Sequence, residues 1–138
     1  MAVRNNNGQL LVAAVSSFNF ITDIEVAKAK AICESIHLAL SKGLKPLCVE
    51  SDSYNVVSLC SSVSHFKCDL GNIVQDVRDI VALNDVRSVY FIPRSSNLVA
   101  HGLAKWALLW KSPTIWAKNF PNWLVKLAEY DVLVSSSC

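Results

Sequence analysis

The residue best placed to do chemistry is Asp52, in the polar tetrapeptide Glu50-Ser51-Asp52-Ser53. The apolar run before it, Leu44–Val49, predicts a buried strand, and open α/β sheets place their sites at the C-terminal ends of such strands. Mg²⁺-dependent phosphoryl chemistry needs several carboxylates around one or two hard cations, about 3.5 to 4 Å apart when paired. Asp52 alone does not supply them, and the same tetrapeptide also predicts a capping turn at the start of a helix.

Other catalytic patterns are weaker. A Ser-His-Asp hydrolase would need a nucleophile elbow such as GxSxG, and the four glycines form none. The five cysteines contain no CxxC pair and no histidine at zinc-ligand spacing, which predicts reduced, mostly buried thiols of an intracellular protein. Four tryptophans could stack nucleobases, but their spacing favours packing between elements. They are Trp106, Trp110, Trp116 and Trp123.

Charge is unevenly distributed although the net charge is only +2. The stretch from Val86 to Ala128 holds six basic residues and no Asp or Glu. Such a segment indicates either a polyanion-binding surface or a solvated basic face. Asp76 and Asp79, one helical turn apart, are expected to face solvent.

The composition predicts one folded domain rather than a disordered or membrane-spanning chain. The 138 residues are 52% hydrophobic and 17% charged, which excludes a low-complexity chain. No apolar run reaches the roughly 18 to 20 residues of a membrane span. The short apolar run Leu10–Val15 follows Asn5-Asn6-Asn7-Gly8 rather than a basic stretch, so a secretory signal is not expected. The prediction is an intracellular protein, nuclear or cytoplasmic.

The elements that would position these residues alternate between strand and helix. Asn7-Gly8 predicts a hairpin turn, Thr22-x-x-Glu25 a capping box, and Lys42-Gly43 a helix end. Ser51, Asp52 and Ser53 are all candidate caps of the next helix. Beyond Ser112-Pro113 we expect irregular chain and a short final helix. The predicted elements are strands at 2–4, 9–15, 44–49 and 86–92, and helices at about 22–42, 54–60, 70–81 and 98–110.

Taken in order, these landmarks resemble the ribonuclease H-like domain, in particular its plant retroelement, reverse-transcriptase-like branch. The resemblance covers nearly the whole chain and implies an α/β (α+β) fold, a mixed sheet flanked by helices. The segments that carry it are Val3–Leu10, the helix Ala27–Gly43, Val49–Ser53, Ile92–Asn97, Val99–Lys105 and the Trp-rich tail Trp116–Asp131.

The resemblance implies a function: cleavage of the RNA strand of RNA–DNA hybrids by two Mg²⁺ ions held by an acidic cluster. Asp52 matches one acid of that cluster and is the expected metal ligand. Lys28 falls where the family has a glutamate, and His101 where it has its late aspartate. Glu25 lies one turn before Lys28, but its carboxylate would be displaced by about 4.5 to 5 Å. We therefore expect catalysis to be impaired.

The family's first, central strand has no counterpart, which predicts a chain truncated at its N-terminus. We expect a ribonuclease H-like domain over residues 1–111 and a C-terminal extension over 112–138. Three functions stay open: a hybrid nuclease that retains Asp52, an inactive module that binds nucleic acid or another protein, and a structural remnant. For the second, the expected contacts to an RNA–DNA hybrid or RNA are Arg94, Asn97 and Lys105.

Overall fold

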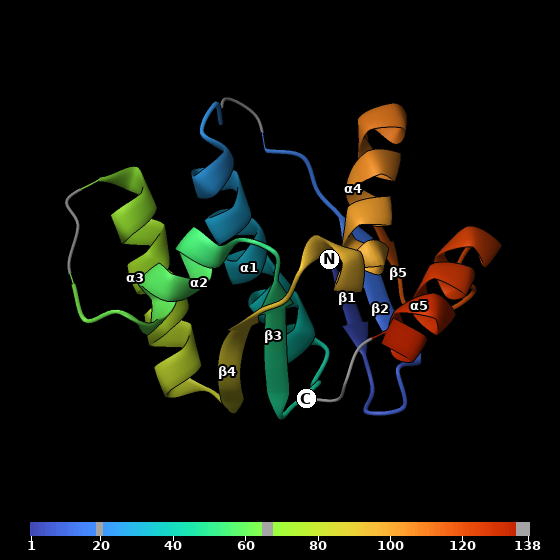
Figure 1. Cartoon of the computed structure of the whole chain (residues 1–138), viewed down its shortest axis with the longest axis horizontal. Coiled ribbons are helices and arrows are strands. Elements are labelled where there is room, and N and C mark those ends of the chain that lie inside the picture. Colours follow the sequence, from blue (N-terminus) through green and yellow to red (C-terminus); the bar gives the residue numbers. More distant parts are fainter. Residues whose placement is uncertain (19–20, 65–67, 135–138) are drawn as a thin grey trace. The chain divides into compact units, whose positions relative to one another are not determined.

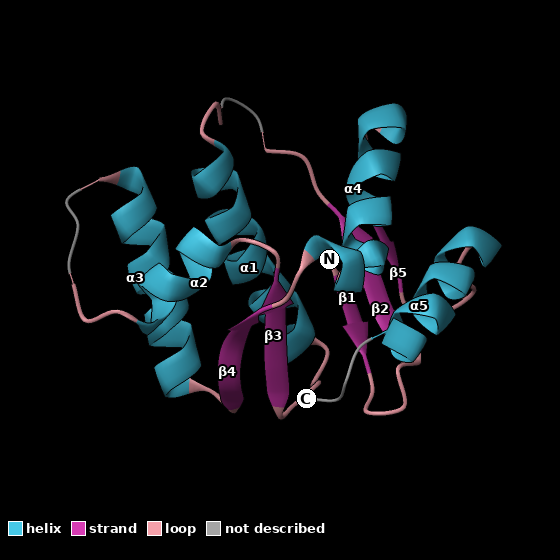
Figure 2. Cartoon of the chain, viewed as in Figure 1, coloured by secondary structure: helices cyan, strands magenta, loops and turns pink. Residues whose placement is uncertain are grey.

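The computed structural model describes residues 1–18, 21–64 and 68–134, in which helices and strands are interspersed along the chain (Figure 1). The strands form two sheets, one of order β1-β2-β5 and one of order β3-β4 (Figure 2). The strands are β1 (Ala2–Arg4), β2 (Leu10–Val15), β3 (Leu47–Ser51), β4 (Val86–Phe91) and β5 (Thr114–Trp116). The helices are α1 (Ile24–Ser41), α2 (Tyr54–Ser61), α3 (Asp69–Leu83), α4 (Leu98–Trp110), α5 (Asn122–Val134) and the 3₁₀ turn η1 (Arg94–Ser96).

The chain divides into two compact units. The first combines Met1–Phe18 with the chain from Pro93 onwards, and the second is the intervening segment up to Ile92. The predicted boundary at residue 111 stays a prediction. The chain after it supplies β5 and α5 to the first unit.

The first unit is an antiparallel sheet with two helices packed on it. The predicted hairpin is confirmed: β1 pairs with β2, and Gly8 in the connecting turn has φ 78°. β5 pairs with the other side of β2, with Ala13 opposite Trp116. This strand falls where irregular chain was predicted, because a three-residue run carries too little pattern to be recognised. The core of the first unit is formed by Ala13, Val15, Val99, Leu103, Leu124 and Ala128.

The second unit places three helices against the parallel pair β3–β4. Helix α1 buries Ala29, Ile32, Ile36 and Ala39, spaced one helical turn apart as the sequence indicates. Lys42 is the C-cap residue of α1. The next residue, Gly43, has a φ of 71°, which suits a residue without Cβ. The N-cap of α1 is Asp23 and not the predicted Thr22, since the Asp23 carboxylate accepts the backbone N–H groups of Glu25 and Val26.

Two further details differ from the sequence predictions. β3 begins after Pro46 and runs to Ser51, whereas the predicted strand spanned 44–49, because proline lacks the N–H that a ladder needs. The thiols are less buried than predicted: Cys48 and Cys68 are exposed, and Cys33 and Cys60 are half-buried. Asp76 and Asp79 are exposed, as expected. The fifth cysteine, Cys138, lies outside the described residues.

Candidate functional site

The carboxyl end of β3 and helix α1 bring together two of the predicted site residues. Asp52 directly follows β3, and the Nζ atom of Lys28 on α1 lies 3.9 Å from its Oδ1 atom. Both side chains are partly exposed, at 33% for Lys28 and 21% for Asp52. Lys28 comes close to Asp52 because α1 packs against both β3 and α2. Lys28 therefore presents an ammonium group to the Asp52 carboxylate.

The turn after β3 is a tight and largely buried one. The Ser51 hydroxyl accepts the backbone N–H of Ser53 at 3.2 Å. Ser53 is the N-cap residue of α2 but makes no side-chain cap, and its buried Oγ has no hydrogen-bond partner among the described residues. The prediction that a residue of this turn starts α2 is confirmed in position, while the capping bond itself is absent at Ser53.

These residues do not fit the pair of Mg²⁺ ions that the resemblance implies. Hard divalent cations take several carboxylate oxygens, and paired ions need an acidic cluster. Within residues 1–18, 21–64 and 68–134 no group of three or more His, Cys, Asp or Glu side chains is arranged to hold a metal. The nearby Lys28 ammonium adds repulsion toward a cation at Asp52. The described residues around Asp52 therefore do not support a metal-dependent step.

The remaining predicted site residues belong to the first unit. Arg94 is exposed in η1, Asn97 is the residue before α4, His101 lies in the first turns of that helix, and Lys105 is exposed one turn further on. Asn97 occupies the N-cap position, yet its side chain makes no capping bond.

The cap of α4 comes instead from Asp131, a residue that the sequence reasoning missed. Its carboxylate accepts the N–H groups of Leu98 at 3.1 Å and Val99 at 3.0 Å, from α5. Arg4 of β1 lies 3.7 Å from the same carboxylate, which is fully buried. An acid inside the apolar run of the last helix was the available signal, since buried carboxylates need partners. Asp131 thus holds the segment that carries Asn97 and His101.

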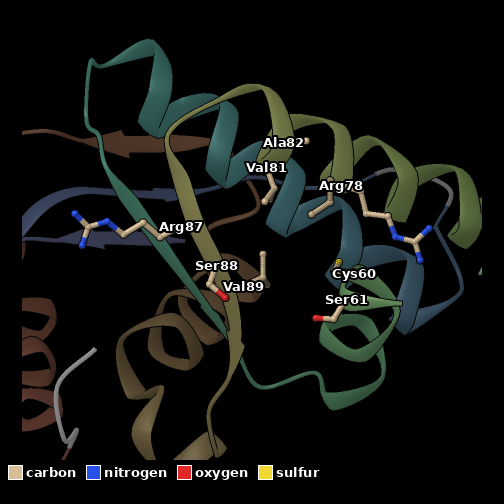
Figure 3. Close-up of a pocket in the computed structure, with 9 residues that line it drawn as sticks. Cys60, Ser61, Arg78, Val81, Ala82, Arg87, Ser88 and Val89 are labelled. Carbon is tan, nitrogen blue, oxygen red and sulfur yellow. The ribbon is translucent and has the colours of Figure 1, made fainter. Parts of the chain in front are cut away.

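A cavity of about 220 Å³ lies elsewhere in the second unit, between α2, α3 and β4 (Figure 3). Its polar lining includes Cys60, Ser61 and Ser88, and the guanidinium groups of Arg78 and Arg87 point away from it. Arg78 instead donates to the Leu59 and Ser64 carbonyl oxygens. Burial raises the pKa of the Cys60 thiol, so the thiolate is disfavoured at neutral pH. Nothing in this cavity is arranged for nucleophilic chemistry.

A second hollow, of about 430 Å³, belongs to the first unit. It is lined by the β1–β2 turn and by Phe120, Val125 and Ala128. Neither hollow includes Asp52 or Lys28. The candidate site at the end of β3 therefore lies outside both hollows.

The tryptophans largely pack, as their spacing indicates. Trp106, Trp116 and Trp123 lie against the core of the first unit. Trp106 stacks on Trp110 with ring centroids 5.4 Å apart, and Trp106 and Trp116 make an edge-to-face contact with centroids 5.0 Å apart. Trp110 differs from the expectation because 60% of it is exposed.

In the described residues, five α-helices and two sheets form a mixed α/β protein, consistent with a ribonuclease H-like fold. The family model described as reverse transcriptase-like matches residues 1–107. The chain therefore belongs to the reverse transcriptase-like family. Neither the curated proteins nor the solved structures contain a match to it. In the part of the chain that is described, no helix combines the length and the apolar character needed to cross a membrane.

Proposed function

We propose that this chain is a ribonuclease H-like domain that binds nucleic acid, an RNA–DNA hybrid or RNA, without cleaving it. The observation that carries the proposal is the Lys28 ammonium 3.9 Å from Asp52, at the position where the family places a second carboxylate. Exchanging glutamate for lysine changes the local charge by two units, from attracting a divalent ion to repelling it. Membership in the reverse transcriptase-like family supports a nucleic-acid ligand.

The binding residues in this proposal are Arg94, Asn97 and Lys105. Arg94 and Lys105 are exposed on a stretch of sequence that holds no acid from Val86 to Ala128. Contacts to phosphates release counterions, so the affinity should fall steeply with salt. His101, which falls where the family has its late aspartate, is half-buried in α4. Because imidazole suits softer ions than Mg²⁺, His101 would serve as a hydrogen-bonding group to the bound nucleic acid and not as a metal ligand.

A finer point of the resemblance belongs to the same proposal. We propose that the chain comes from the plant retroelement branch of the family. The order of the matched segments supports this branch.

The decisive experiment is a cleavage and binding assay on a labelled RNA–DNA hybrid in Mg²⁺ or Mn²⁺. The expected result is binding that weakens with salt, no cleavage, and a weaker affinity for Arg94→Ala and Lys105→Ala. Lys45→Ala, an exposed lysine of the second unit, is the matched control for losing one positive charge. Cleavage that Asp52→Asn abolishes would contradict the proposal and restore the nuclease. Absence of binding at low salt would leave a structural remnant.

A reverse experiment addresses the lysine itself. Lys28→Glu restores the acid of the family beside Asp52 and removes the cation. We expect this variant to gain affinity for Mn²⁺ relative to the parent, measured by calorimetry on the protein alone. Lys30→Glu, on the same helix, is the control for added negative charge. An equal gain in both variants would show that net charge, and not the position of Lys28, governs metal binding.

A further inference from the structure

An aromatic pair lies exposed at the carboxyl ends of β3 and β4. Tyr54 is the first residue of α2, and Phe91 is the last residue of β4. Their ring centroids are 5.6 Å apart and their planes are inclined by 85°, an edge-to-face contact. Tyr54 is 67% exposed and Phe91 44%. Two large rings are thus fixed against each other at the surface and not in the core.

The pair stands next to the Lys28–Asp52 ion pair. Ser51 is opposite Phe91 in the parallel ladder, and only Asp52 and Ser53 separate Ser51 from Tyr54. The packing of α2 does not require either ring, because Val56 and Val57 are its buried residues. Exposed aromatic surface that the core does not use is typical of a binding surface.

The geometry suits a flat ligand. An edge-to-face contact itself covers one face of one ring and one edge of the other, and both rings keep exposed surface on which a flat ligand can stack. A nucleobase offers a π-face whatever its identity, and stacking on an aromatic side chain is a common way to hold unpaired bases. Bases inside a duplex are already stacked on each other. The matching ligand is therefore a single strand, or a nucleotide turned out of a duplex.

We infer that Tyr54 and Phe91 form a stacking platform for an unpaired base of a nucleic-acid strand. The inference rests on the proposed function and names the part of the ligand that this site would recognise. Lys28 can reach a phosphate of the same strand, while Asp52 offsets most of its charge. Binding at the platform should therefore depend on the base more than on salt.

The test compares two short fluorescein-labelled single-stranded oligonucleotides, identical except that the second lacks its central bases. Fluorescence anisotropy on the full chain gives the two dissociation constants. We expect the oligonucleotide with bases to bind about tenfold more tightly, as stacking of one base on an aromatic ring allows. Tyr54→Ala and Phe91→Ala should reduce this ratio toward one, whereas Tyr54→Phe should keep it. Tyr130→Ala removes a similarly exposed tyrosine, 56% exposed on α5, and should leave the ratio unchanged.

Circular dichroism establishes that each variant is folded. We expect folded variants because Tyr54 and Phe91 are both exposed. A ratio near one in the parent, or a ratio that Tyr54→Ala leaves intact, would overturn the inference. If hybrid binding still depends on Arg94 in that case, the proposed function stands without the platform. Absence of binding to every nucleic acid at low salt would overturn both. An equal effect of Tyr130→Ala would also refute the platform, since it would show a response to any lost ring.

Discussion

Two carboxylates, Asp131 in the first unit and Asp52 in the second, show how differently one residue type can be used. Asp131 is fully buried, accepts two backbone N–H groups at the start of α4, and lies 3.7 Å from Arg4. Asp52 is partly exposed and lies 3.9 Å from Lys28. Burial with several donors marks a structural charge, because an unpaired charge would be very costly there. Exposure at a strand end leaves a carboxylate accessible to ligands.

The N-termini of α4 and α2, which lie next to the candidate residues, differ in the same way. Helix α4 is capped from 32 residues away by Asp131, which ties it to α5. The N-cap residue of helix α2 is Ser53, whose buried hydroxyl makes no bond within the described residues. The first start is rigidly held through a long-range contact. The second start carries an unfavourable group, as strained or unsatisfied positions near sites often do.

The largest expected effect comes from removing the buried carboxylate. Asp131→Ala leaves Arg4 and two backbone N–H groups without this acceptor, and breaking a buried ion pair in this way costs about 3 to 5 kcal/mol. Urea unfolding followed by circular dichroism measures the loss. Glu129→Ala, on an exposed position of the same helix, should change stability by less than about 0.5 kcal/mol.

Asp131→Asn covers the case in which the alanine variant does not fold. The amide keeps an oxygen acceptor but lacks the charge, so its loss should be smaller than that of alanine and larger than that of the Glu129 control. Equal stabilities for Asp131→Asn and Glu129→Ala would contradict a structural role for the buried charge.

The elements of both units could largely be predicted because their signals are local. The α1 pattern of Ala29, Ile32, Ile36 and Ala39, and the Asn7-Gly8 turn, each lie within a few residues of one another. Asp52 was identified for the same reason, since a polar cluster directly follows an apolar run. The ion pair between Asp52 and Lys28 could not be predicted from local sequence. Only the family resemblance indicated that position 28 lies near Asp52.

The cap of α4 could not be predicted because its two halves are far apart in sequence. Asn97 has the residue type of a local cap, and Asp131 lies 34 positions later in an apolar helix. Which of them bonds the first N–H groups depends on how α5 packs on α4, a tertiary contact without a local pattern. β5 is similar, since its three residues become a strand only through pairing with β2.

The next effect compares the caps of α1 and α2. Asp23→Ala removes an acceptor 2.8 Å from the Glu25 N–H and should cost about 1 kcal/mol. Ser53→Ala removes a hydroxyl that satisfies no donor among the described residues, so it should be neutral or stabilising. Thermal melting of the two variants shows which substitution causes the larger loss of stability. A loss at Ser53 as large as that at Asp23 would show that the Ser53 hydroxyl is bonded in solution.

The smallest effect is expected at the Lys28–Asp52 pair. A partly exposed ion pair contributes about 0.2 to 1 kcal/mol, because water and salt screen the charges and both side chains lose rotamer freedom. A double-mutant cycle of Lys28→Met and Asp52→Asn isolates the coupling energy, measured by urea unfolding at low and high salt. The coupling should shrink as salt rises. A coupling well above this range, and insensitive to salt, would place Asp52 with Asp131 among the structural charges and remove the reason to regard it as a ligand-binding group.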